Sequence, residues 1–114
     1  MVNAVLASPY STQTIQIESD TKTLSKDHIT GHIVSYNNNL PSKHPDFKGI
    51  SLVGRYSRTS EEEINNTASE IMMNRNVRGS VVFALRRKSD GKYIDIDSST
   101  LTRVCNIIKS REIS

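Results

Sequence analysis

Hydrophobic and polar positions in the first half of the chain follow the short periods of β-strands. Along Thr12–Glu18 the alternation places Ile15 and Ile17 on one face, which is typical of a half-buried strand. The segments His28–Tyr36 and Phe47–Tyr56 are rich in β-forming residues and predict two more strands. One side of the third strand is expected to carry Ile50, Leu52, Gly54 and Tyr56.

Two other segments of the first half lack a regular pattern. Residues 1–11 are expected to form a loosely held N-terminal arm, because Pro9 blocks regular structure there. An Asn-rich turn at residues 37–39 leads into a polar loop that contains Pro41 and Pro45. No linker or internal repeat divides the chain, so residues 1–114 are expected to form a single domain.

The second half opens with the pattern of an amphipathic helix. Ser60 and Glu63 match a capping box, in which each side chain bonds the backbone amide of the other residue. An apolar stripe with helical spacing follows, made of Ile64, Ala68, Ile71 and Met72. Gly79 provides a stop, so a helix is predicted between Ser60 and Gly79.

Ser80–Asp97 has the pattern of a β-hairpin. The pair Asp90-Gly91 favours a two-residue type I′ turn, which would place Leu85 opposite Ile96 and Arg86 opposite Asp95. In that register one face carries the apolar residues Val81, Phe83, Leu85, Ile94 and Ile96.

A second amphipathic helix is predicted at the end of the chain. Ser98 or Ser99 is the expected N-cap, and the apolar stripe consists of Leu101, Val104, Cys105 and Ile108. The order of elements is therefore β-β-β-α-β-β-α. This order predicts an α+β fold, an antiparallel sheet of about five strands with two helices packed on one face.

The outer face of the predicted hairpin carries two further apolar residues, Val82 and Ala84. They alternate with the core set, so another surface is expected to cover them. We therefore expect Val82 and Ala84 to form a subunit contact in a homodimer.

Composition narrows the class of protein. The formal charge is +3 with a pI of about 9.2, mean hydropathy is −0.47, and Cys105 is the only cysteine. A lone cysteine suits a reducing compartment, and no apolar run approaches the roughly 20 residues of a membrane span. We expect a cytoplasmic protein without membrane contact. The composition, rich in Asn, Ser, Thr and Ile and poor in aromatic residues, favours a viral origin.

Basic residues gather in the second half of the chain and suggest phosphate binding. The candidate nucleic-acid-binding residues are Arg55, Arg58, Arg75, Arg78, Arg86, Arg87, Lys88 and Lys92. Tyrosines that are candidates for stacking on bases are Tyr36, Tyr56 and Tyr93. The competing interpretation is that hairpin tips are basic for solubility and that Asp95 neutralises Arg86.

Catalytic and metal chemistry have weaker support. His28 and His32 share a strand face, but no acidic residue or cysteine nearby completes a zinc site. No nucleophile elbow, phosphate-binding loop or dinucleotide fingerprint occurs, so no cofactor is expected. The leading hypothesis is a non-enzymatic, self-associating module that binds nucleic acid, with RNA favoured. A structural or protein-interaction subunit is the alternative, and a small enzyme is third.

Overall fold

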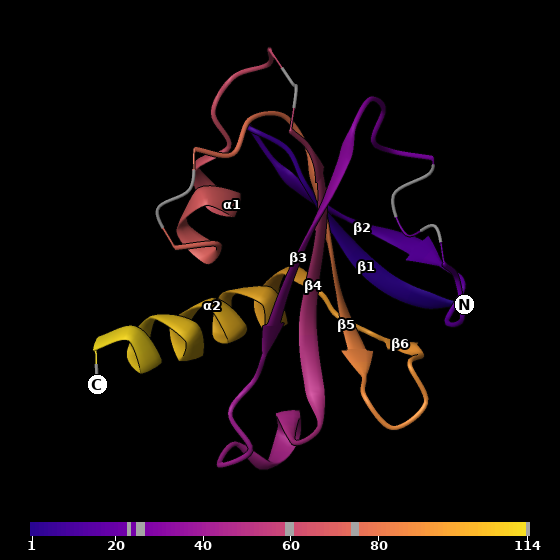
Figure 1. Ribbon diagram of the computed structural model, residues 1–114, viewed down its shortest axis with the longest axis vertical. Coiled ribbons are helices and arrows are strands. Elements are labelled where there is room, and N and C mark those ends of the chain that lie inside the picture. Colours follow the sequence, from indigo (N-terminus) through magenta and orange to yellow (C-terminus); the bar gives the residue numbers. More distant parts are fainter. Residues whose placement is uncertain (23, 25–26, 59–60, 74–75, 114) are drawn as a thin grey trace.

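The computed structural model describes residues 1–22, 24, 27–58, 61–73 and 76–113, the last three by their backbone alone. The strands are β1 (Val2–Ala7), β2 (Thr12–Ile17), β3 (Ile33–Asn39), β4 (Ile50–Ser57), β5 (Val81–Arg87) and β6 (Tyr93–Ile94). The helices are η1 (Pro45–Phe47), α1 (Asn66–Ile71) and α2 (Ser98–Ile113). The sheet is antiparallel with the order β2-β1-β5-β4-β3, and β6 also pairs with β5 (Figure 1). The predicted α+β class is confirmed, with six strands instead of about five.

The N-terminal segment is a strand of this sheet, so the prediction of a loose arm is wrong. β1 pairs with β2 on one side and with the first half of β5 on the other. Ala4 and Val5 are both completely buried although they face opposite sides of the sheet. A strand buried on both faces shows no alternation in sequence, and Pro9 lies in the turn that follows.

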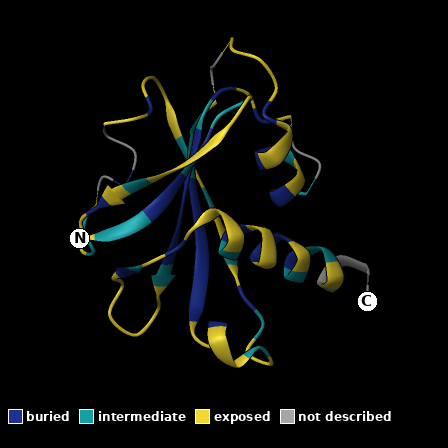
Figure 2. Cartoon of the chain, turned by 180° about the vertical axis from the view of Figure 1, so that it is seen from behind, coloured by how far each residue is buried: buried dark blue, intermediate teal, exposed yellow. Residues whose placement is uncertain are grey.

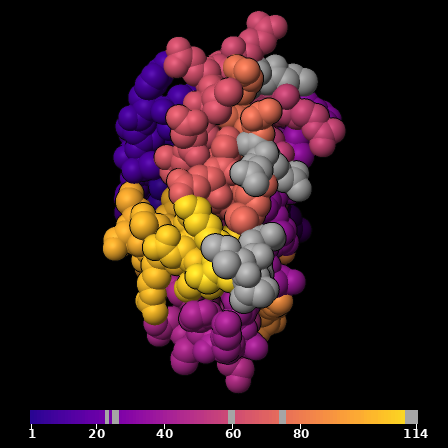
Figure 3. Space-filling model, turned by 90° about the vertical axis from the view of Figure 1, so that its left-hand side faces the viewer, coloured from indigo at the N-terminus to yellow at the C-terminus, as the bar shows by residue number. Residues whose placement is uncertain are grey.

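Both helices pack on one face of the sheet (Figure 1), and Figure 3 shows them next to each other on the surface of that side. They enclose the helix-side core, which includes Leu52, Met72, Phe83, Val104 and Ile108. The predicted stripe of α2 is confirmed, because Leu101, Val104, Cys105 and Ile108 are all buried while the opposite side of the helix is exposed (Figure 2). Neither serine caps the helix. Asp97 Oδ1 accepts a hydrogen bond of 2.7 Å from the amide of Thr100, and this bond lowers the pKa of Asp97.

α1 is shorter than predicted and begins later. Residues 61–65 precede the helix, so Glu63 is not in its first turn, and Ser60 lies outside the described residues. The N-cap is Asn65, whose Oδ1 accepts from the amide of Ala68 at 3.0 Å. The helix ends at Ile71, well before Gly79. The stripe is confirmed for three of its four residues: Ala68, Ile71 and Met72 are buried, whereas Ile64 is 41% exposed.

A second core lies on the other face of the sheet and consists of Ala4, Ile17, Leu24, Ile29, Val53, Val82, Ala84 and Tyr93. It corrects the predicted subunit contact and the predicted start of β3. Val82 and Ala84 are 0% exposed, because Leu24 and Ile29 from the β2–β3 connection pack over them. They are therefore not available as a subunit contact. Residues 28–32, which were predicted to open the next strand, belong to this connection, so β3 begins at Ile33 instead of His28.

The hairpin register differs from the prediction by two residues. Leu85 pairs with Ile94, and Arg86 pairs with Tyr93, so the loop contains four residues, 88–91. Gly91 has a φ of 71° and donates its amide to the carbonyl of Arg87, whereas a type I′ turn would also need a positive φ at Asp90. A shift of two residues keeps every side chain on its face, so the predicted apolar face is confirmed.

Candidate nucleic-acid interface

Two arginines from neighbouring strands share the face of the sheet that lies away from the helices. Arg55 is in β4 and Arg86 is in β5. Along their strands they alternate with helix-side residues and follow the parity of Val53 and Ala84, which belong to the second core. Both side chains are partly exposed. The register of the β4–β5 pair thus places both guanidinium groups on one surface.

These arginines line a hollow of about 360 Å³ beside the β5–β6 loop. Its four basic residues are Lys22, Arg55, Arg86 and Lys92, and together we call them the cationic hollow. The acidic residues at its wall are Asp20 and Asp90. The charge of the hollow therefore depends on whether these carboxylates neutralise its cations.

Asp90 is occupied by a residue outside the cationic hollow. It accepts two hydrogen bonds from Arg87, the shorter of 2.7 Å, and one of 3.0 Å from the amide of Lys92. These bonds, the arginine first, lower the pKa of Asp90 to about 2. Arg87 is thus the main partner of Asp90, and the charge of Lys92 acts on the same carboxylate more weakly.

Arg86 is not paired with Asp95, the acidic partner predicted from the sequence. In the observed register Asp95 does not face Arg86 and instead accepts a hydrogen bond of 2.7 Å from the amide of Asn3. The ion pairs found within the described part of the chain include no residue of the cationic hollow. The side chain of Arg55 donates to the hydroxyl of Ser35, a neutral partner.

The remaining predicted cations lie elsewhere. Arg87 is on the helix-side face and is paired, and Lys88 is exposed in the hairpin loop. Arg58 and Arg78 lie at the opposite end of the sheet, and Arg58 is about 26 Å from the loop end of β4, given about 3.3 Å per residue from Ile50 onward. Arg75 lies outside the described residues. The structure therefore unites three of the eight predicted cations, Arg55, Arg86 and Lys92.

Lys22 was missed by sequence reasoning. It stands alone in a polar loop, without a pattern that links it to a hairpin 70 residues later in the chain. The link is tertiary, because the amide of Tyr93 donates to the carbonyl of Ser19 at 2.6 Å and holds this loop beside β6.

The predicted stacking tyrosines do not serve the hollow. Tyr93 lines it but is only 4% exposed, since its ring belongs to the second core. Tyr36 and Tyr56 are partly buried and pack against the helix-side core. The cationic hollow therefore offers charge and hydrogen bonds, while Tyr36 and Tyr56 lie on the other face of the sheet.

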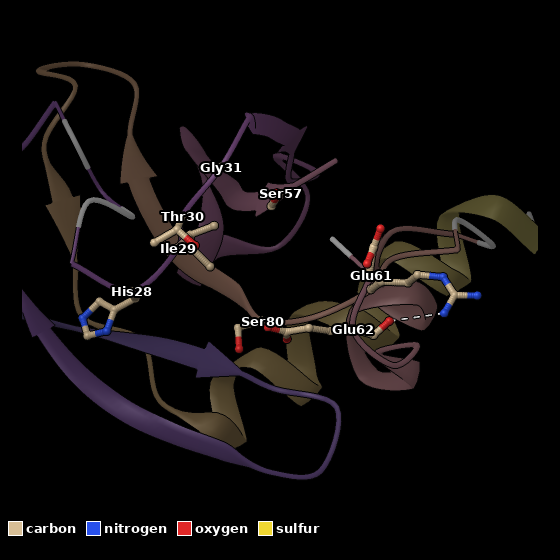
Figure 4. A pocket seen from close by; sticks show the side chains of 9 residues that line it. His28, Ile29, Thr30, Gly31, Ser57, Glu61, Glu62 and Ser80 are labelled. Carbon is tan, nitrogen blue, oxygen red and sulfur yellow. Dashed lines mark hydrogen bonds between the residues drawn. The ribbon is translucent and has the colours of Figure 1, made fainter. Parts of the chain in front are cut away.

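A larger hollow of about 500 Å³ lies at the opposite end of the sheet (Figure 4). Glu61 and Glu62 form one wall, and residues 28–31 form another. Arg78 also lines it and donates to the backbone carbonyl of Glu62 at 3.2 Å, the dashed line in Figure 4. Its two glutamates outnumber its one arginine, so the charge of this hollow does not suit a phosphate ligand.

Within the described residues, no group of three or more His, Cys, Asp or Glu side chains is placed to hold a metal ion. Cys105 is buried, and this burial raises the pKa of its thiol, as for a structural cysteine. No helix in the described part of the chain is both long and apolar enough to cross a membrane.

The chain matches no protein-family model, no curated protein and no solved structure. Function must therefore be inferred from the site itself.

Proposed function

We propose that the chain binds nucleic acid, preferentially RNA, through the cationic hollow. The observation that supports this proposal is the convergence of Arg55 and Arg86 on one face, together with Lys22 and Lys92. The carboxylate of Asp90, in the hairpin loop, is paired with Arg87. Phosphate is the ligand class that best fits uncompensated guanidinium groups, because they bind its oxygens in pairs and displace condensed counterions.

The spacing of the two arginines suits an extended phosphate backbone better than a single small anion. Arg86 pairs with Ser51, four residues before Arg55 on β4, which corresponds to about 13 Å along the strand. Side chains at that spacing can contact two different phosphates of one strand. The hollow between them would hold the sugar-phosphate chain against the sheet.

Neutral polar groups on the same face favour RNA over DNA. The exposed hydroxyl of Ser35 lies beside Arg55, and the exposed amide group of Asn39 accepts a hydrogen bond of 2.9 Å from the buried Ser51, which lies opposite Arg86. Hydroxyl and amide groups next to a phosphate contact can bond the ribose 2′-OH, which DNA lacks. We therefore expect the hydroxyl and amide groups beside Arg55 and Arg86 to discriminate RNA from DNA.

Replacing Arg86 by alanine is expected to weaken RNA binding by at least about tenfold, since a hydrogen bond to a charged group contributes roughly 1.5–3 kcal/mol. The measurement is fluorescence anisotropy with a labelled RNA oligonucleotide, single-stranded and as a duplex, and with DNA of the same sequence. Arg58→Ala is the matched control, because it removes the same charge from an exposed position at the far end of the sheet. We expect it to change affinity by no more than about twofold.

Equal losses for Arg86→Ala and Arg58→Ala would show that only net charge matters and would contradict a site at the hollow. Absence of binding to every probe would refute the proposed function and favour a structural or protein-interaction subunit. Circular dichroism on both variants checks that the fold is retained.

A further inference from the structure

We propose that the free edge of β3 pairs with β3 of a second copy of this chain and so joins two sheets in an antiparallel dimer. β3 (Ile33–Asn39) is the last strand in the sheet order, and among the residues that the structure describes it pairs with β4 alone. This inference is independent of nucleic-acid binding, because it concerns the backbone of the sheet edge and not the cationic hollow.

The hydrogen-bond pattern identifies the backbone groups that face outward. Leu40 donates its amide to the carbonyl of Ile50 at 3.0 Å, and Arg58 donates to the carbonyl of His32 at 3.1 Å. In an antiparallel pair, residues that exchange bonds alternate along the strand. The even-numbered residues of β3 therefore bond to β4. The odd-numbered residues Ile33, Ser35 and Asn37 direct N–H and C=O away from the sheet.

This edge lacks the devices that keep strands from pairing. Its sequence, Ile-Val-Ser-Tyr-Asn-Asn-Asn, contains no charged residue, no proline and no glycine. Natural edge strands are normally protected by lysines, prolines, bulges or short length. At seven residues β3 is longer than average for a strand. The other edge strand, β2, is also uncharged but is one residue shorter, and the side chain of Thr12 at its start is hydrogen-bonded to Ser98 of α2.

A second copy is the partner that fits the chemistry of this edge. A charged peptide would gain no ion pair from an uncharged strand, whereas β3 itself is an extended, uncharged strand with the matching spacing. A two-fold axis through the middle of β3 lets the outward groups of both copies satisfy one another, and the contact closes at two copies. Because a single strand pair is small beside the roughly 1,200–2,000 Å² of a standard interface, the dimer should dissociate on dilution.

The test uses charge at Asn37, an exposed residue at the middle of the edge. In an antiparallel self-pair the two copies of residue 37 are direct or diagonal neighbours. By analytical ultracentrifugation the unmodified chain should form dimers at high concentration. Asn37→Lys and Asn37→Glu alone should each weaken dimerisation about fivefold or more through like-charge repulsion, and their equimolar mixture should restore it.

Asn106→Lys adds the same charge on the exposed side of α2 and should leave dimerisation unchanged. Amide hydrogen exchange gives a second measurement. The amides of Ser35 and Asn37 should exchange fast in dilute solution and become protected at high concentration, while those of Val34 and Tyr36 stay protected throughout. A chain that remains monomeric at millimolar concentration, or a mixture that does not recover dimers, would overturn the proposal and leave a foreign strand as the partner to seek.

Discussion

Replacing Asn65 by alanine is expected to lower the free energy of unfolding by about 3–5 kcal/mol, the sum of a lost helix cap and two unsatisfied carbonyl groups. Asn65 is completely buried. Its Nδ2 donates to the carbonyl of Ala7 at 2.8 Å and to that of Gly79 at 2.9 Å, while its Oδ1 caps α1. One side chain thus joins the end of β1, the start of α1 and the segment that leads into β5.

Urea denaturation measures this loss, and the neighbouring Asn66 provides the control. Asn66 is exposed at the first position of α1, so Asn66→Ala should change stability by no more than about 0.5 kcal/mol. If the two alanine variants lost similar stability, the assignment of Asn65 as the link between these three segments would be wrong.

The second large effect is expected at Phe83. This residue is 0% exposed in β5, the central strand of the sheet, and its ring covers Gly54 on β4. A Cβ atom added at Gly54 would lie 3.2 Å from Cε1 of Phe83, which shows how closely the ring packs on that backbone. Phe83→Ala should therefore leave a cavity in the helix-side core and reduce the free energy of unfolding by about 3–5 kcal/mol.

Phe83→Leu serves as the matched variant, because it keeps most of the apolar volume and should cost about 1.5 kcal/mol or less. Thermal and urea unfolding of both variants distinguish a packing effect from a general intolerance of β5 to substitution. A loss for leucine as large as that for alanine would argue against the cavity as its cause.

Elements with a clear period were predictable from the sequence because each buries one face. The alternation around Ile15 and Ile17 predicted β2, and the stripe that includes Leu101 and Ile108 predicted α2. In the hairpin the same argument gave the correct faces with the wrong register. A shift of two residues leaves the face of Leu85 unchanged, so periodicity alone cannot distinguish the two registers.

The errors arose where tertiary contacts override local signals. β1 is buried on both faces, and α1 starts directly after its N-cap Asn65, whose side-chain amide binds carbonyls distant in the sequence. Val82 and Ala84 were expected to be exposed, but the β2–β3 connection covers them. The local sequence of the β2–β3 connection has no pattern that predicts its packing over Val82 and Ala84.

The candidate site was predictable only in part. The sequence identified Arg55, Arg86 and Lys92 as candidates but did not show that they converge, since this depends on the β4–β5 register. The predicted register also paired Arg86 with Asp95. In the observed register these two residues are not opposite each other, and the ion pair is formed by Arg87 and Asp90. The site became distinct once the register determined which cations share a face.

The salt dependence of RNA affinity, compared between the unmodified chain and the double variant Arg55→Ala/Arg86→Ala, tests the proposed function most directly. Each lost phosphate contact should reduce the slope of log affinity against log salt by about 0.7 for a single strand or 0.9 for a duplex. We expect the slope of log affinity against log salt to be shallower by about 1.4–1.8 in the double variant. An unchanged slope, or no RNA binding by the unmodified chain, would contradict the assignment of the cationic hollow as a phosphate-binding site.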